Sequence, residues 1–248
     1  MSAGSKAKSG KFNASINTVE FGTGDKAVKI GGENVFPLYS FDAAIENAPK
    51  VGIEITDFGM EHEPECIKKY YEGCATLADM ARKAASMEGV DFLSFRMEGG
   101  DPNGANKSTE ELIGELKEIA DAVDLPLVVC GCKNVEKDAE LFSKAAEALN
   151  GKNAVILSAK EENYKTVGAA AGLAYKQIVG AESAVDINLA KQLNVLISQL
   201  GVDSKSVVMN VGSAAVGYGF EYVISTMDRV KAAALQQGDA NLQMPIIT

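Results

Sequence analysis

The feature that most constrains the fold is a repeated alternation of short β-prone apolar runs with longer amphipathic segments. Seven such runs begin near Val51, Asp91, Pro126, Asn153, Ile178, Ser206 and Met244. They recur about every 32 residues, the spacing typical of an eight-fold βα barrel. The runs at 127–129 and 155–157 are apolar at every position, as expected for strands that are covered on both faces. A strand that returns after each helix indicates parallel strands joined by right-handed crossovers.

The segments between the runs have helical periodicity. Ser108 and Glu111 form a capping-box pattern ahead of an apolar stripe that extends to Val123. Similar stripes predict helices over 77–84, 142–149, 164–174, 189–200 and 222–234. No GxGxxG motif follows the first strand, which disfavours the alternative of a Rossmann fold. The sequence therefore predicts a (βα)8 TIM barrel.

The two ends of the chain depart from this repeat. The first 18 residues predict a loose basic tail, and the runs 18–21 and 26–30 flank a Gly-rich link that is typical of a β-hairpin. We therefore expect an N-terminal tail and hairpin extension over 1–50 and a barrel domain over 51–248. After the seventh run no residues remain for helix seven, strand eight or helix eight. We expect a barrel truncated after strand seven, an incomplete chain that lacks its last one or two βα units, with strand one and strand seven unpaired or bridged by another segment.

Charge and hydropathy exclude several classes of protein. The 34 acidic and 24 basic residues give a formal net charge of −10, which disfavours nucleic-acid binding. No apolar run approaches the roughly 18 residues of a membrane span, and no secretory signal is present. We therefore expect a cytoplasmic protein with reduced thiols.

Histidine and cysteine usage limits the metal sites. His62 is the single histidine, which excludes centres built from several histidines. Cys130 and Cys132 lie two apart on a predicted strand and could present both sulfurs to one metal. A structural metal or iron–sulfur site needs about four ligands, and Cys66 and Cys74 have no reason to converge on the pair. Burial as small apolar side chains is the favoured interpretation.

In a βα barrel, functional residues lie at the carboxyl ends of the strands. The polar residues at these positions are Asp57, Glu98, Asp101, Cys132, Asn134, Lys160, Glu161, Asn163, Glu182, Asp186, Asn188, Asn210 and Ser213. This end of the barrel, its mouth, is rich in carboxylates and amides and poor in arginine. That composition disfavours phosphosugar chemistry.

Some of these residues have structural interpretations as well. Asp186 is expected to cap the following helix. The Gly-rich stretch 212–219 could cradle a ligand with its backbone N–H groups or form a tight turn. Lys160 could be a Schiff-base nucleophile, but Glu161 and Glu162 beside it favour the charged form. The residues alone thus indicate a cytoplasmic barrel with a polar mouth and no defined reaction.

Several segments taken together resemble a known family. They are GGENVFPLYSFDAAIENAPKVGIEITD (31–57), DPNGANKS (101–108), CGCKNVEKDAELF (130–142), AKEENYKT (159–166), DINLAKQLNVLI (186–197), GYGFEYVISTMDRVKAAALQ (217–236) and LQMPII (242–247). From about residue 26 onward the chain is similar to the small (delta) subunit of the corrinoid iron–sulfur protein of the acetyl-CoA decarbonylase/synthase system. It departs from that family at Asn210-Val211-Gly212, where an Asp-Pro-Ser/Thr stretch is common, and the family continues past the Met-Pro-Ile-Ile segment.

The resemblance implies a role in methyl transfer. In that family a barrel subunit pairs with a large (gamma) subunit that carries a [4Fe–4S] cluster and a corrinoid-binding domain. The corrinoid takes a methyl group from methyltetrahydrofolate, or a pterin analogue, through a methyltetrahydrofolate methyltransferase. It passes the group to acetyl-CoA synthase in the Wood–Ljungdahl pathway.

The resemblance also implies where this chain contributes. It would shield the corrinoid with its mouth as a non-autonomous subunit, with no catalytic residue or metal ligand of its own. Because the loops at the ends of strands five and six combine glycines with neutral hydrogen-bonding groups, we expect the corrinoid to face one set of residues. That set is Asp186, Asn188, Asn210, Ser213, Gly217, Tyr218 and Gly219. The alternative is a stand-alone barrel enzyme, either a pterin-dependent methyltransferase or a lysine aldolase.

Overall fold

The computed structural model of the chain describes residues 12–36 and 45–248. Most of the predicted basic tail lies outside these ranges. The predicted hairpin is confirmed: β1 (Val19–Phe21) and β2 (Val28–Ile30) pair antiparallel across a short 3-10 turn (Gly24–Lys26). Val19 lies opposite Ile30 and Phe21 opposite Val28, so the register places apolar side chains on one face.

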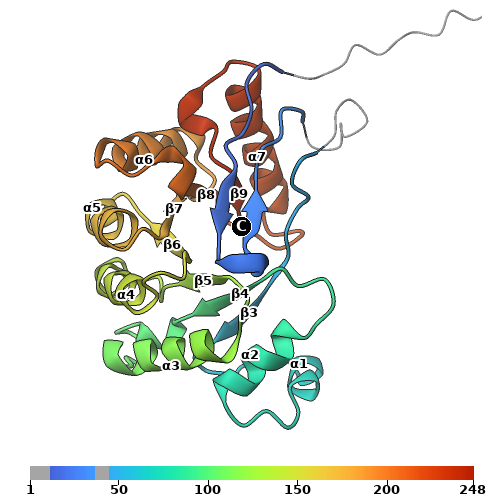
Figure 1. Cartoon of the computed structure of the whole chain (residues 1–248), viewed down its shortest axis with the longest axis vertical. Helices are drawn as coiled ribbons and strands as arrows, with labels where there is room; N and C mark the ends of the chain where they lie inside the picture. The colour runs from blue at the N-terminus through green and yellow to red at the C-terminus, as the bar shows by residue number, and fades with distance from the viewer. Residues whose placement is uncertain (1–11, 37–44) are drawn as a thin grey trace, which may run out of the picture.

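Seven parallel strands form the main sheet and follow one another in sequence order (Figure 1). They are β3 (Gly52–Thr56), β4 (Phe92–Arg96), β5 (Leu127–Cys130), β6 (Val155–Ala159), β7 (Ile178–Glu182), β8 (Val207–Asn210) and β9 (Ile246–Ile247). The sheet curls into a half-barrel whose two edges are β3 and β9. This arrangement confirms the prediction of seven barrel strands in which strands one and seven do not pair with each other.

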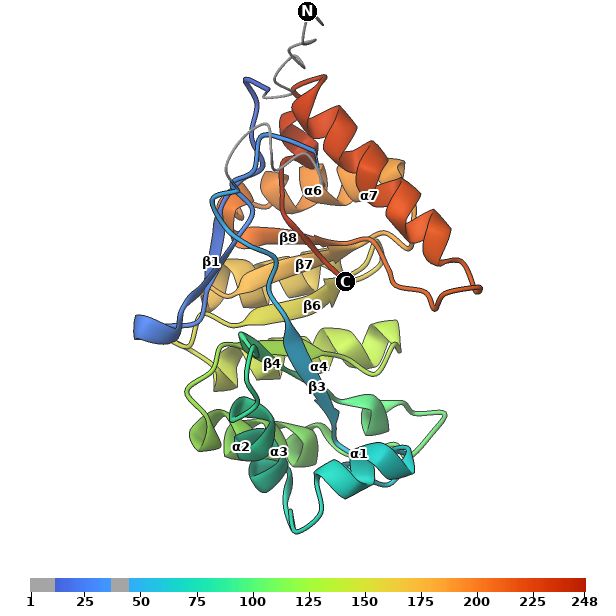
Figure 2. The ribbon, with the colours of Figure 1, turned by 90° about the vertical axis from the view of Figure 1, so that its right-hand side faces the viewer.

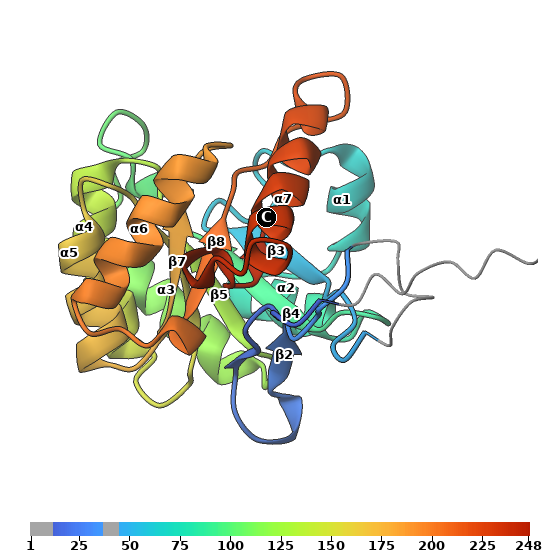
Figure 3. The same ribbon diagram turned by 90° about the horizontal axis from the view of Figure 1, so that it is seen from above.

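The helices cover the outside of the curl, and α3 to α6 lie side by side along it (Figures 1 and 3). They are α1 (Glu65–Tyr70), α2 (Leu77–Ala85), α3 (Thr109–Ala122), α4 (Val135–Ala148), α5 (Tyr164–Val167), α6 (Ile187–Gln199) and α7 (Phe220–Leu235). Short 3-10 turns lie at Glu98–Gly100, Ser204–Ser206 and Ala240–Leu242. None of the helices in the described ranges has the length and apolar content needed to cross a membrane.

Two helical features differ from the prediction. The sequence pattern missed α1, which has no buried residue and therefore no apolar stripe to reveal it. The predicted helix over 164–174 changes at Gly168 into a π-helical segment (Gly168–Ala174). A Cβ on Gly172 would lie 2.7 Å from Val202 Cγ2. The glycine therefore permits a close approach that a longer side chain would prevent.

The side chains inside the curl form a small apolar core that the hairpin completes. Val128, Val155 and Val208 from the sheet are buried with Val19 and Phe21 from the hairpin. Figure 2 shows the hairpin at the start of strands β6 to β8, opposite the end where the loop before α7 lies. The hairpin therefore covers the amino ends of the strands.

Close contacts fix the hairpin to this end of the sheet. Gly22 N donates to Asn153 O at 2.7 Å, and Asn153 Nδ2 donates to Glu20 O at 2.9 Å. A Cβ on Gly22 would lie 2.4 Å from Pro126 Cγ, so the contact requires glycine. The hairpin thus closes the amino end of the curl and leaves the carboxyl ends of the strands uncovered.

Candidate functional site at the barrel mouth

A cavity of about 1360 Å³ lies inside the curl and extends to the carboxyl ends of the strands. Its deep wall is apolar and includes Phe21, Phe92, Val128, Leu157 and Ile247. Charged and polar side chains from the strand ends line the wall nearer the mouth. An apolar cavity with a few converging polar groups is the usual form of a ligand or cofactor site.

The first polar group of the cavity is the ion pair between Glu54 on β3 and Arg96 on β4. Arg96 Nε donates to Glu54 Oε1 and Arg96 Nη2 to Glu54 Oε2, both at 2.8 Å, so the contact is bidentate. Ser94 Oγ donates to Glu54 Oε2 at 3.4 Å. The hydrogen bond with Glu54 raises the pKa of Arg96 further above its ordinary value. This geometry uses both carboxylate oxygens, so the pair presents little unsatisfied charge to the cavity.

The second polar group joins three neighbouring strands. Lys160 directly follows β6, Glu182 is the last residue of β7, and their Nζ and Oε1 atoms lie 3.5 Å apart. Asn210, the last residue of β8, donates from Nδ2 to Ser158 Oγ at 2.9 Å. Its Oδ1 accepts from Gly212 N at 3.0 Å, which fixes the start of the loop before α7.

The two cysteines at the end of β5 are buried, as predicted, and point to different sides of the sheet. Cys130 belongs to the interior core, with its Sγ 3.5 Å from Ser94 Oγ, whereas Cys132 belongs to the core beneath the helices. Burial raises the pKa of Cys130 and raises that of Cys132 to about 11. In the described part of the chain, no three histidine, cysteine or acidic side chains are arranged to hold a metal ion.

The structure divides the predicted corrinoid-facing residues into two sets. Residues that line the cavity are Asn210, Ser213, Tyr218 and Gly219, and those that do not are Asp186, Asn188 and Gly217. Asp186 caps α6, as expected, because its Oδ1 accepts from Asn188 N at 2.8 Å and Leu189 N at 3.2 Å. The loop before α7 therefore supplies most of the predicted residues that lie at the rim of the cavity.

The loop before α7 and the first turns of that helix expose large apolar side chains. Val216 is 82% exposed, Tyr218 87% and Tyr222 67%, and Phe220 and Ile224 are also exposed. Tyr218 and Tyr222 line the cavity as well. Apolar side chains gathered in one exposed segment are typical of a surface that another molecule covers.

The neighbouring loop, after β7, has a strained backbone. Ala184 and Val185 adopt φ values of 45° and 64°, and this region is unfavourable for a β-branched residue. Val185 N donates to Val211 O at 2.8 Å, and Thr226 Oγ1 donates to Val185 O at 3.2 Å. These hydrogen bonds hold together the loop after β7, the loop after β8 and α7. Strain of this kind is concentrated at functional sites.

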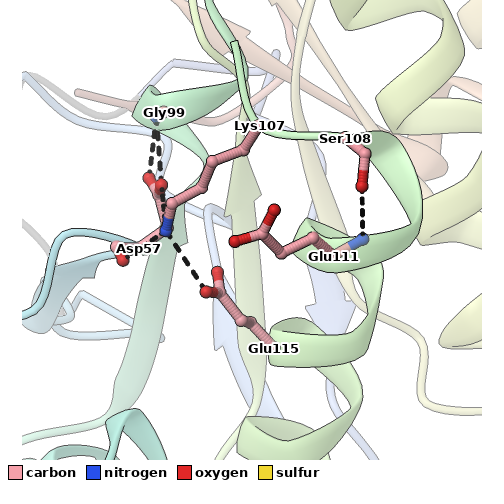
Figure 4. A network of polar contacts seen from close by, with 6 residues as sticks. All are labelled: Asp57, Gly99, Lys107, Ser108, Glu111 and Glu115. Atoms are coloured by element: carbon pink, nitrogen blue, oxygen red, sulfur yellow. Dashed lines mark hydrogen bonds and ion pairs between the residues drawn. The ribbon is translucent and has the colours of Figure 1, made fainter. Parts of the chain in front are cut away.

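Asp57, predicted as a mouth residue, instead belongs to a buried network outside the cavity (Figure 4). Its Oδ1 and Oδ2 accept from Gly99 N at 2.9 and 3.1 Å, and Lys107 Nζ lies 3.0 Å from Oδ2. Lys107 Nζ also donates to Glu115 Oε1 at 3.2 Å. A Cβ on Gly99 would lie 2.2 Å from Asp57 Oδ2, so the network requires glycine there. Burial raises the pKa of Glu115.

The sequence analysis missed Glu54 and Arg96, which lie within strands and not after them. The available signal was the alternation of polar and apolar residues in two parallel strands. Glu54 stands between two isoleucines, and Ser94 and Arg96 stand two apart. Residues two apart share one face of a strand, so these side chains could have been assigned to the interior.

The curled parallel sheet, its outer helices and its polar mouth define a protein of the TIM-barrel class. The profile described as "CO dehydrogenase/acetyl-CoA synthase delta subunit" matches residues 18–248. The chain belongs to this family, which confirms the resemblance seen in the sequence.

Curated relatives include delta subunits of the acetyl-CoA decarbonylase/synthase complex. The subunit of Methanothermobacter thermautotrophicus is 32% identical over 238 residues, which cover 95% of this chain and 60% of the relative. The Methanopyrus kandleri subunit is 34% identical over 91% of this chain and 56% of the relative. The chain therefore spans somewhat more than half the length of these relatives.

One solved structure with a similar outline is dihydropteroate synthase from Xanthomonas albilineans in complex with 7,8-dihydropteroate. The TM-score is 0.44 at 17% sequence identity, and the match covers 80% of this chain and 69% of the synthase.

Proposed function

We propose that this chain is the small subunit of the corrinoid iron–sulfur methyl carrier. In this proposal it pairs with a large (gamma) subunit that holds most of the corrinoid and carries the [4Fe–4S] cluster. Its barrel mouth covers one face of the corrinoid. When bound, the corrinoid supplies a cobalt centre that accepts and releases a methyl group. The methyl donor system is a methyltetrahydrofolate methyltransferase, and the acceptor is acetyl-CoA synthase.

The observation that carries this proposal is the composition of the mouth. Exposed apolar side chains, Val216, Tyr218 and Tyr222, adjoin the neutral hydrogen-bonding groups of Asn210 and Ser213. A corrin has an apolar macrocycle with amide side chains around its edge. Apolar residues can cover the ring while neutral donors and acceptors meet the amides, so the residues present fit this group.

The residues of this chain would position and shield the corrinoid and need not exchange protons with it. Tyr218 and Tyr222 would exclude water from the covered face. Asn210 and Ser213 would orient the amides, with Gly219 allowing close approach. The remaining predicted rim residues, Asp186, Asn188 and Gly217, would form the outer part of the same rim.

The lysine aldolase alternative needs a neutral Lys160 amine as nucleophile. Lys160 Nζ instead lies 3.5 Å from Glu182 Oε1, so the amine is engaged in an ion pair and is not free to attack a carbonyl. Borohydride reduction in the presence of a carbonyl substrate should therefore trap no adduct on Lys160. A mass increase on the peptide that contains Lys160 would favour the aldolase.

Co-purification from native cells, followed by a visible spectrum of the complex, tests the carrier assignment. We expect a larger partner of comparable abundance together with corrinoid and iron–sulfur absorption. A chain that purifies alone, without either chromophore and with a barrel-enzyme activity of its own, would refute the proposal.

A variant in the rim supplies a second test. Gly219 has a φ of 109° and lines the cavity, so Gly219→Val should disturb the loop and slow methyl transfer in the assembled complex. Gly151→Val, at an exposed turn with no atom within 4 Å of its Cβ position, is the matched control because its φ of 83° imposes a similar backbone cost. Equal transfer rates in the two variants would remove the loop from the proposed contact.

A further inference from the structure

We infer that Lys160, Glu182 and Ser158 form a receptor for a neutral primary carboxamide that enters the barrel from the mouth. The inference rests on the proposed function, which supplies the ligand: one amide side arm of the corrin. It goes beyond coverage of the macrocycle, because it assigns a specific pocket inside the barrel to a specific chemical group.

The position of the three residues supports such a receptor. They lie at the carboxyl ends of the adjacent strands β6 and β7, where Ala159 pairs with Ala181 in the register. All three line the cavity. The side chains of Lys160 and Glu182 are 25% and 30% exposed, so both are accessible from the cavity while being partly withdrawn from water.

The hydrogen bonds of the three residues leave capacity for a ligand. The single Lys160–Glu182 contact is 3.5 Å long, against the two 2.8 Å bonds that join Arg96 to Glu54. Ser158 is 5% exposed, and its Oγ accepts from Asn210 Nδ2. The Ser158 hydroxyl proton thus remains available for a further acceptor.

The charges of the receptor define the class of ligand. An anion entering here would meet the Glu182 carboxylate, and a cation would meet the Lys160 ammonium; each would leave one partly buried charge poorly paired. A primary carboxamide offers a carbonyl acceptor and two N–H donors without net charge. Its oxygen can accept from Lys160 Nζ and Ser158 Oγ while its nitrogen donates to Glu182.

The test compares two forms of the corrinoid-bearing partner in the reconstituted complex. One form is loaded with cobinamide, which has amide arms, and the other with cobyrinic acid heptamethyl ester, in which ester groups replace the amides. We expect the wild-type chain to bind the amide-loaded partner about tenfold more tightly, the value of one good charge-assisted hydrogen bond. Lys160→Met and Glu182→Gln should each lower the ratio of the two dissociation constants severalfold, while the contacts of Asn210 and Ser213 with other amide arms persist.

A matched control uses the exposed ion pair of Lys144 and Glu147 on α4, whose Nζ and Oε2 atoms lie 3.0 Å apart. Lys144→Met and Glu147→Gln should retain the wild-type ratio. Acetylation of Lys160, measured by mass spectrometry on the wild-type complex, supplies a readout that needs no variant. Lys160 should be protected by the amide-loaded partner and labelled with the ester-loaded one.

The outcomes separate this inference from the function on which it rests. A wild-type ratio of one, a folded Lys160→Met chain that retains the full wild-type preference, or equal labelling of Lys160 in both complexes would overturn the receptor. In each of these cases binding to the partner persists, and the carrier function stands. Failure to bind the partner in either form would overturn both.

Discussion

Replacing Asp57 by alanine should destabilise the fold strongly, because its buried side chain has two separate partners. The side chain is 0% exposed; its oxygens accept from Gly99 N, and Lys107 Nζ lies 3.0 Å away. Truncation leaves the buried Gly99 N–H without an acceptor, which costs about 1–3 kcal/mol. Breaking a buried ion pair costs about 3–5 kcal/mol in all. Lys107 retains its ion pair with Glu115 and is 20% exposed. We therefore expect a loss of unfolding free energy at the lower end of this range, about 3 kcal/mol.

Urea unfolding followed by far-ultraviolet circular dichroism measures this loss, because the chain has no tryptophan to report it by fluorescence. Asp57→Asn keeps an acceptor for Gly99 N and removes only the charge, so it should cost about 1–2 kcal/mol. Asp101→Ala is the control, because it removes only the exposed hydrogen bonding of a turn, in which Asn103 N donates to Asp101 Oδ1. It should cost under about 1 kcal/mol. An Asp57→Ala chain as stable as Asp101→Ala, or an asparagine variant as unstable as the alanine variant, would refute the reasoning.

Three further predictions address titration, packing and association. Burial raises the pKa of Glu115, so the native carboxyl holds its proton more tightly than the unfolded one. Its stabilising contribution is complete below about pH 4.3, the unfolded value, and is lost as pH rises through the native pKa. In urea titrations from pH 4 to 7, the free energy of unfolding should show this fall for wild type and not for Glu115→Gln. Parallel profiles of the two proteins would contradict the assignment to Glu115. Gly131→Ala should lower stability by about 1–3 kcal/mol in thermal unfolding, because its Cβ would lie 2.2 Å from Asp138 Oδ1. Gly104→Ala, whose Cβ meets nothing closer than 3.6 Å, should melt nearer to wild type; equal melting of the two would contradict the packing argument. Tyr218→Ser should leave unfolding unchanged, because the residue is 87% exposed, and weaken association with the corrinoid-bearing partner about tenfold or more in a binding titration. Unchanged affinity would exclude Tyr218 from the interface.

Much of the architecture could be predicted from the sequence because it depends on local periodicity. The apolar runs and the helical stripes each record which residues face the core. The Gly-rich link specified the hairpin, and the oxygens of Ser108 and Asp186 cap the helices that begin beside them. These features depend on residues within a few positions of one another. The same approach failed for α1, which buries no side chain.

Only the tertiary structure decided which strand-end residues face the cavity. Asp57 and Glu182 look alike in the sequence, since each lies at the carboxyl end of a strand. The curl of the sheet turns Glu182 inward, whereas the approach of Gly99 and Lys107 holds Asp57 outside the cavity. Likewise the hairpin could be predicted as a unit, but its position against the amino ends of the strands depends on Gly22 meeting Pro126, more than 100 residues away. Contacts of this range have no local periodicity to record them. They follow from the curling of the sheet, which brings distant segments of the chain to one surface.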